Sequence, residues 1–221
     1  MKPAVVIAVF LLAAQSKAPA ELPAPAAVSL VQSLVKAAPH RDHVWRDRAP
    51  MLNGLVYAYI EIPLGERRKY ELDIAKNERF IDRVMPEKVG GYPVNYGIVP
   101  QTISYDGDPF DVLVLGPALP GGEMVSGVIV GLMQMEDEKG PDAKVVISRV
   151  GRDGKPLHQL TTADRDRMAA FFNRYKAEDG DPKTFAKVPG WGSAEEGLSY
   201  VLTTHAFYWK CRNTGGKACR L

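Results

Sequence analysis

Six short segments between residues 55 and 150 have the apolar, β-branched composition of strands, and glycine or proline residues separate them. They cover residues 55–62, 69–73, 80–84, 111–115, 124–135 and 144–150. Many short strands joined by such turns fold into a barrel or a sandwich. This pattern constrains the fold more than any other feature of the chain.

Two segments with helical spacing of apolar residues follow the strands. The first spans about residues 163–176. The second begins at Ser193, where Glu196 completes a capping box, and runs to about Tyr208. We therefore predict an α+β fold in which a β-barrel is flanked by C-terminal helices.

The first 54 residues differ from the rest. Residues 1–20 combine a positive start, an eleven-residue apolar run and small residues suited to cleavage, which is typical of a secretory signal peptide. A membrane anchor would need about 20 apolar residues, so we expect cleavage, a periplasmic or secreted protein, and no membrane partner afterwards. Residues 21–54 would form an N-terminal extension, in which His40 and His43 are expected to be solvated.

Composition excludes some partners. The chain is 46% hydrophobic and 24% charged, as globular domains are. It has 28 Lys and Arg against 26 Asp and Glu, and loss of Lys2 and Lys17 with the signal makes the two numbers equal. Because a neutral chain has no overall field that attracts a polyanion, we predict no nucleic-acid partner.

The C-terminal tail, residues 209–221, holds the only two cysteines, Cys211 and Cys219. In an oxidising compartment a disulfide between them is expected. Zinc ligation with His205 is the alternative, but the sequence offers no matching fourth ligand.

The most chemically informative motif is DGDPFD at residues 106–111, directly before an apolar strand. Its three carboxylates suit hard cations such as Mg²⁺, which commonly shares its coordination sphere with substrate phosphates. A calcium-binding hand starting at Asp106 would need glycine at position 111 and glutamate at 117, where the chain has Asp111 and Pro117. The motif therefore favours phosphate chemistry.

A second acidic cluster, residues 136–138 with Asp142, follows the strand at 124–135. Beside the first motif it would complete a site for two or more divalent ions, an arrangement used for displacement at phosphorus. Arg83 lies between Ile81 and Val84, so we expect a buried guanidinium. It would bind phosphate or form a structural ion pair with a neighbouring carboxylate.

Seven blocks now stand in a recognisable order: EIP at 61–63, KYE at 69–71, DR at 82–83, YPVNYG at 92–97, DGDPFD at 106–111, DEKGPDAK at 137–144 and FFNRYK at 171–176. Over about residues 55–208 the chain resembles the family I, Mg²⁺-dependent inorganic pyrophosphatases. The resemblance implies an OB-like five-stranded barrel, several Mg²⁺ ions per site with Mn²⁺ or Zn²⁺ as substitutes, pyrophosphate as the substrate, and a homo-oligomer.

The resemblance also implies a role for each matched residue. Asp108 would accept the proton of the attacking water, in an in-line hydrolysis of diphosphate to two phosphates without a covalent intermediate. The implied metal ligands are Asp106, Asp111, Asp142, Asp137 and Glu61. The implied substrate ligands are Lys69, Arg83, Tyr96, Tyr175, Lys176 and Lys144.

Two other functions stay open at the level of sequence. OB-like barrels also serve as binding modules for nucleic acids or sugars, although the acidic clusters oppose polyanion binding. A metal-dependent phosphohydrolase with broader substrates, such as nucleotides or polyphosphate, would share the same residues.

Overall fold

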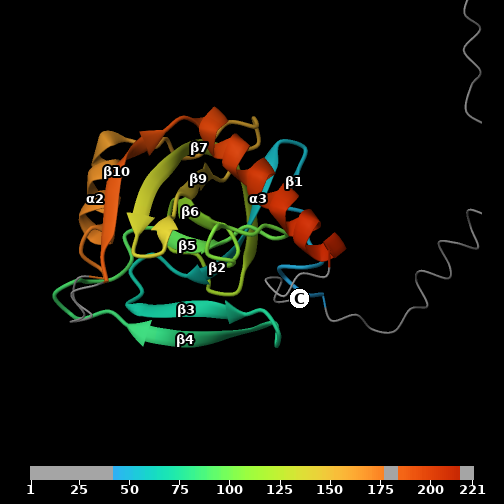
Figure 1. Cartoon of the computed structure of the whole chain (residues 1–221). Coiled ribbons are helices and arrows are strands. Elements are labelled where there is room, and N and C mark those ends of the chain that lie inside the picture. Colours follow the sequence, from blue (N-terminus) through green and yellow to red (C-terminus); the bar gives the residue numbers. More distant parts are fainter. Residues whose placement is uncertain (1–41, 177–183, 215–221) are drawn as a thin grey trace, which may run out of the picture. The chain divides into compact units, whose positions relative to one another are not determined.

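Five strands close into a ring in the computed structural model, which describes residues 42–176 and 184–214 (Figure 1). In ring order they are β2 (Leu55–Ile62), β5 (Asn95–Ile98), β6 (Asp111–Leu115), β9 (Lys144–Ser148) and β7 (Met124–Asp137). Pairing of β7 with β2 closes the ring, and only β6 and β9 run parallel. The predicted five-stranded barrel of an α+β fold is confirmed.

The ring strands are buried on both faces, which explains their continuous apolar runs. Along β6, Val112 and Val114 pack in one core cluster with Val201 of the C-terminal helix. Leu113 and Leu115 point the other way, into a second cluster that includes Phe171. This alternation is the two-residue period of a strand.

Helices α2 (Thr162–Phe172) and α3 (Ala194–Thr214) supply the outer layer; α2 packs beside β10 (Ala186–Gly192), and α3 packs against β7 and β9. Ser193 and Glu196 form the predicted capping box at the start of α3. The helix extends beyond Tyr208, and α2 ends earlier than predicted, continuing as turns to residue 176. No helix within residues 42–176 and 184–214 is long and apolar enough to cross a membrane.

Four strands were missed by the sequence prediction, of which β5 and β10 are the longer two. In β5, a Cβ on Gly97 would lie 1.9 Å from the Tyr59 carbonyl oxygen, so the glycine permits close approach to β2 and is not a turn signal. Strand β10 contains Pro189 and pairs with β7 across an irregularity between Lys187 and Gly190. Two short strands, β1 (Met51–Leu52) and β8 (Gly140–Pro141), complete the sheet.

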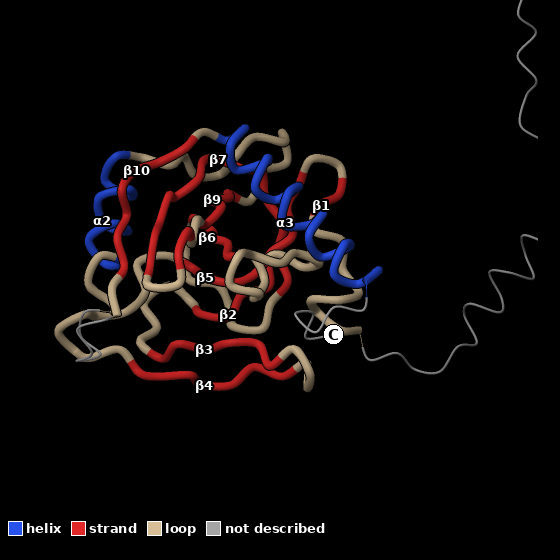
Figure 2. Tube along the Cα trace, in the orientation of Figure 1, coloured by secondary structure: helices blue, strands red, loops and turns tan. Residues whose placement is uncertain are grey.

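Strands β3 (Arg68–Asp73) and β4 (Glu78–Val84) form a separate two-stranded hairpin, set apart from the ring in Figure 2. Two contacts join the hairpin to the end of β2. The Leu72 amide donates to Glu61 Oε1 at 2.7 Å, and Arg79 Nη1 donates to the Glu61 carbonyl oxygen at 2.8 Å. The hairpin therefore faces one end of the ring.

Several predictions concern residues outside the described part of the chain. These are the signal peptide at 1–20, the extension up to residue 41 with His40, and Cys219, so the Cys211–Cys219 disulfide stays a prediction. His43 is described, and its predicted solvation is wrong. Its side chain is buried, because the imidazole ring lies against the β3–β4 turn, with Nε2 2.7 Å from the Ile74 carbonyl oxygen.

Candidate active site

A cavity of about 580 Å³ lies between the β3–β4 hairpin and the adjoining end of the ring. Ten of the twelve predicted catalytic, metal and substrate residues line it: Glu61, Lys69, Tyr96, Asp106, Asp108, Asp111, Asp137, Asp142, Tyr175 and Lys176. Residues far apart in the sequence thus converge on one space.

The DGDPFD motif forms a tight turn followed by the first residue of β6. Gly107 has a φ of +87°, which favours glycine, and the Asp108 carbonyl oxygen accepts from the Ser104 amide at 2.7 Å. Phe110 is buried and fixes the end of the turn. Asp106 and Asp108 therefore stand on a short anchored loop, and Asp111 projects from the strand behind it.

The parallel pairing of β6 and β9 brings a lysine between two carboxylates. Because Val112 is in register with Val145, the preceding residues Asp111 and Lys144 lie side by side. Lys144 Nζ donates to Asp111 Oδ2 at 2.5 Å and to Asp142 Oδ1 at 2.8 Å. The lysine is 1% exposed, so it lies behind the cavity wall instead of lining it.

The second acidic cluster reaches the cavity through the β7–β8 hairpin, in which Asp137 pairs with Gly140. Lys176, just after α2, donates to Asp137 Oδ2 at 2.6 Å and to Glu138 Oε1 at 2.9 Å. Tyr175 is buried beside this lysine and stacks on Phe171. One turn of chain thus delivers both a phenol and an ammonium group.

Burial and like charges shift two carboxyl groups toward the neutral form. Burial, reinforced by the nearby Asp111, raises the pKa of Glu61 to about 8. Burial raises the pKa of Asp142 to about 6 against the opposing effect of Lys144, with Asp111 adding to the rise. Burial by itself would lower the pKa of Lys144. The charges of Asp111 and Asp142 outweigh burial, and the pKa of Lys144 is raised above its ordinary value.

The hairpin contributes residues that the sequence reasoning missed. Lys69 contacts Glu71 and donates to Asp82 Oδ2 at 3.1 Å, and Glu71 and Asp73 line the cavity with it. Tyr70, Leu72 and Ile74 line the cavity as well, so this whole stretch borders it and no alternation between strand faces selects the lining residues. Lys139 and Ser104 also line the cavity without having been predicted.

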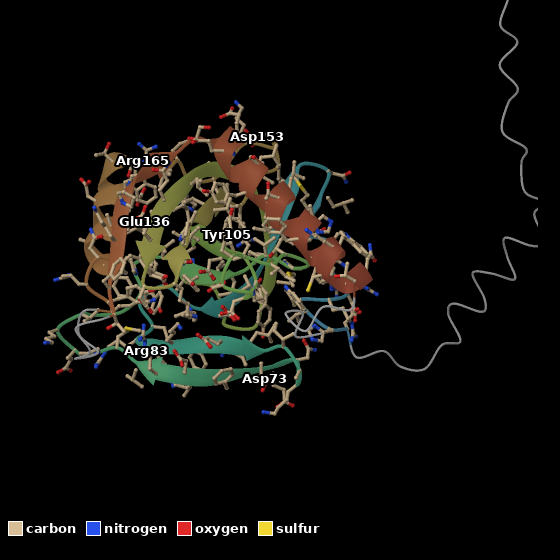
Figure 3. All side chains as sticks on the ribbon, in the orientation of Figure 1. Asp73, Arg83, Tyr105, Glu136, Asp153 and Arg165 are labelled. Carbon is tan, nitrogen blue, oxygen red and sulfur yellow. The ribbon has the colours of Figure 1, made fainter. Side chains whose placement is uncertain are left out.

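Arg83 is the predicted residue that the structure places least favourably. Its neighbours Ile81 and Val84 are exposed, but Arg83 itself is half-buried and its Nε is buried, so the predicted burial of the guanidinium is confirmed in part; Figure 3 labels Arg83 on the hairpin. The guanidinium carbon lies 5.5 Å from the centre of the Tyr175 ring. Arg83 therefore contacts a cavity residue without lining the cavity itself.

The donor chemistry of the cavity suits hard divalent cations. Within residues 42–176 and 184–214 no group of three or more His, Cys, Asp and Glu is arranged to hold an ion. Nevertheless, oxygens of Asp111 and Asp142, from different segments, already converge on one cationic nitrogen. Carboxylate oxygens in this number are the ligands that Mg²⁺, Ca²⁺ and Mn²⁺ prefer.

Comparisons with known proteins agree with one another. The family model described as Inorganic pyrophosphatase matches residues 58–209. An inorganic pyrophosphatase of Saccharolobus solfataricus is 38% identical over 148 residues, covering 64% of this chain and 84% of that protein. The crystal structure of inorganic pyrophosphatase from Thermus thermophilus superposes with a TM-score of 0.69 at 32% identity, covering 76% of this chain and 99% of that one. A structure from Coxiella burnetii gives a TM-score of 0.66 at 36% identity, covering 73% and 99%.

Proposed function

The chain belongs to the inorganic pyrophosphatase family and hydrolyses pyrophosphate to phosphate, and from this premise we propose that the cavity described above is its active site and that Mg²⁺ is its metal. The observation that carries the proposal is the convergence of ten predicted site residues on one cavity. Mn²⁺ and Zn²⁺ would substitute for Mg²⁺.

Five carboxylates form the proposed metal-binding wall. Asp106 and Asp111 come from the DGDPFD motif, Asp137 and Asp142 flank the β7–β8 hairpin, and Glu61 is the next-to-last residue of β2. Bound divalent cations would lower the pKa of water and offset the charge of the phosphates. Glu61, whose pKa is raised to about 8 in the absence of metal, would ionise when it binds a cation.

Asp108 is the proposed general base. Its backbone amide donates to Asp106 Oδ1 at 3.1 Å, which fixes the turn and holds the carboxyl group at the cavity. Asp108 would accept a proton from the attacking water, and positioned proton transfer of this kind contributes about 10²–10⁴-fold to rate. The attack would proceed in line, without a covalent intermediate.

Donors on the remaining walls would bind the two phosphates. Lys69 projects from the hairpin, Tyr96 from β5, and Tyr175 and Lys176 from the turn after α2. Lys144 keeps Asp111 and Asp142 together from behind the wall. Arg83 would reach substrate only by turning off the Tyr175 ring, so we assign it the weakest contact.

The decisive test is phosphate release from pyrophosphate by purified protein, with Mg²⁺ and then with excess chelator. We expect release that requires metal and that falls about 10²–10⁴-fold in Asp108→Asn. Asp166→Asn is the matched control, because Asp166 is exposed on α2 and outside the cavity. Equal rates in the two variants would remove Asp108 from the mechanism, and parallel assays with ATP and a monoester would define the breadth of substrate.

We also propose that the protein is exported, on the basis of residues 1–20, and that it acts in the periplasm or outside the cell as a homo-oligomer without nucleic-acid or membrane partners. Cell fractionation with N-terminal sequencing of the mature chain tests the export. Light scattering on the eluted protein tests the assembly. A full-length cytoplasmic protein, or a monomer at all concentrations, would contradict the respective proposal.

A further inference from the structure

The first described residues, 42–47, contact both the β3–β4 turn and residues 101–102 ahead of the acidic loop, and we call them the strap. They precede the residues that match the family model. Figure 1 shows this start of the described chain, in light blue, beside the turn end of the β3–β4 hairpin.

His43 connects the strap to the hairpin. The side chain is 9% exposed; its Nδ1 accepts from the Trp45 amide at 3.3 Å and the Arg46 amide at 3.1 Å. Its Nε2 lies 2.7 Å from the Ile74 carbonyl oxygen. Because amides only donate and a carbonyl only accepts, these partners require the neutral tautomer with the proton on Nε2.

Asn77 makes a second connection from the hairpin side. Its Oδ1 accepts from the Val44 amide at 3.0 Å, and its Nδ2 donates to the Asp42 carbonyl oxygen at 3.2 Å. Asn77 has a φ of +56°, a conformation that asparagine tolerates better than most residues. The β3–β4 turn is thus bound to the strap by side chains from both partners.

Trp45 anchors the other end of the strap to the body of the protein. It is 2% exposed, its Nε1 donates to the Thr102 carbonyl oxygen at 3.0 Å, and its carbonyl oxygen accepts from the Gln101 amide at 2.8 Å. Its ring packs edge-on against Tyr208 of α3, with centroids 5.2 Å apart. This end of the strap cannot shift without opening a buried cluster.

The two anchored segments are the ones that carry the cavity walls. Ile74 lines the cavity itself and directly follows Asp73 on the strand that holds Lys69. Thr102 begins the loop that leads to Asp106 and Asp108, and its hydroxyl accepts from the Phe110 amide at 2.9 Å. The strap therefore ties the hairpin wall to the acidic loop.

We propose that the strap sets the spacing between these two walls and that His43 is a positioning residue for pyrophosphate hydrolysis, an inference that rests on the function proposed above. His43 touches no residue assigned to metal or proton transfer. It acts by holding the Ile74 carbonyl, and through it the strand that presents Lys69. Loss of this link should let the hairpin move away from Asp108.

Two variants cut the link from opposite sides. His43→Asn keeps a side-chain acceptor near the Trp45 and Arg46 amides, as asparagine does in tight turns, but is too short to reach Ile74. Asn77→Gly suits the positive φ and removes both side-chain hydrogen bonds to the strap. Arg48→Ala is the control, because exposed Arg48 pairs with the Asp42 carboxylate, whereas Asn77 bonds to the backbone of Asp42 and Val44.

The readouts are kcat/KM for pyrophosphate with Mg²⁺ and amide hydrogen exchange at residues 74–77. Losing a single hydrogen bond corresponds to about a three- to tenfold change, so we expect each variant to lose about that much kcat/KM. Exchange at 74–77 should accelerate while β6 amides keep their protection. The double variant, which cuts both connections, should lose more kcat/KM than either single variant.

Several outcomes would overturn the proposal. One is unchanged exchange at 74–77 in both variants. Another is faster exchange with unchanged kcat/KM, and a third is an equal loss of kcat/KM in Arg48→Ala. If the β6 amides also lose protection in His43→Asn, that variant disturbs the whole fold, and the test of the proposal then rests on Asn77→Gly alone. Wild-type protein that releases no phosphate would refute the proposed function, whereas the exchange comparison would still show whether the strap holds the hairpin.

Discussion

Replacing Glu61 by Gln should stabilise the metal-free protein at alkaline pH. The side chain is 4% exposed and accepts from the Leu72 amide at 2.7 Å, a hydrogen bond that a glutamine oxygen can keep. Burial, with the nearby Asp111, raises the pKa of Glu61 from its ordinary 4.5 to about 8. The variant therefore removes a buried acid while preserving its shape and its main contact.

The sign of the effect follows from proton linkage. Between pH 4.5 and about 8 the folded protein keeps a proton on Glu61 that the unfolded chain has lost. The free energy of unfolding therefore falls as pH rises through this window, and the loss is complete above it. One pKa unit corresponds to about 1.4 kcal/mol, which gives an upper limit of about 5 kcal/mol. Because relaxation and water entry reduce such penalties, we expect about 2–3 kcal/mol.

Urea unfolding in excess chelator at about pH 6, 7 and 8.5 measures this effect, because the free energy of unfolding extrapolates linearly to zero denaturant. The measurements start at about pH 6 because the pKa of Asp142 is raised to about 6, so below that pH Asp142 also lowers the free energy of unfolding as pH rises. Glu136→Gln is the control, since Glu136 is exposed on β7. The gap between wild type and Glu61→Gln should widen with pH. Parallel curves for the two proteins would show that Glu61 is ionised in the folded protein and would refute the reasoning.

Three further predictions concern other parts of the fold. Lys144→Met should lower the free energy of unfolding of the metal-free protein by about 3–5 kcal/mol, because it leaves two carboxylates without their buried partner. Mg²⁺ should restore part of this stability, and urea unfolding with and without Mg²⁺ measures both effects. Gly97→Ala should lower the melting temperature by about 6–12 °C, from roughly 3 kcal/mol of overpacking at about 2–4 °C per kcal/mol for a chain of this size, because its Cβ would overlap the Tyr59 carbonyl oxygen; a near-normal melting temperature would mean that β2 and β5 are not so close. Intact mass measured with and without reductant should reveal the Cys211–Cys219 disulfide, and an unchanged mass would exclude it.

The long apolar strands were predictable because burial on both faces leaves a continuous signal. Strand β6 was predicted with its correct bounds for this reason. Strand β5 was missed because its ring position depends on Gly97 fitting against Tyr59, a long-range contact with no local signature. The same holds for β10, whose Pro189 interrupts the pattern while its pairing with β7 supplies the order.

The positions of site residues were predictable where a charged residue stands at the beginning or the end of a strand. Asp111 and Lys144 begin adjacent parallel strands, so their meeting follows from topology once the strands are placed. Arg83 was expected to be buried because apolar neighbours flank it, but those neighbours are exposed on the hairpin, and its buried Nε belongs to a guanidinium that lies over the Tyr175 ring. His43 lies in a charged, loop-like segment, and only its tertiary partner Ile74 explains its burial.

The pairing of charges in the cavity argues for the kind of ligand that it accepts. Lys69, Lys144 and Lys176 each contact two carboxylates, and this compensation lets eight acidic side chains line one cavity. An anion without metal would be repelled by the excess of carboxylates. A cation without an anion would take the carboxylates that pair with the lysines, and a buried lysine without a partner is destabilising. A pyrophosphate that arrives with divalent cations carries both signs and satisfies both sets at once. The cavity therefore favours the metal complex of a small, highly charged anion over a phosphate monoester, which brings fewer charges to either set.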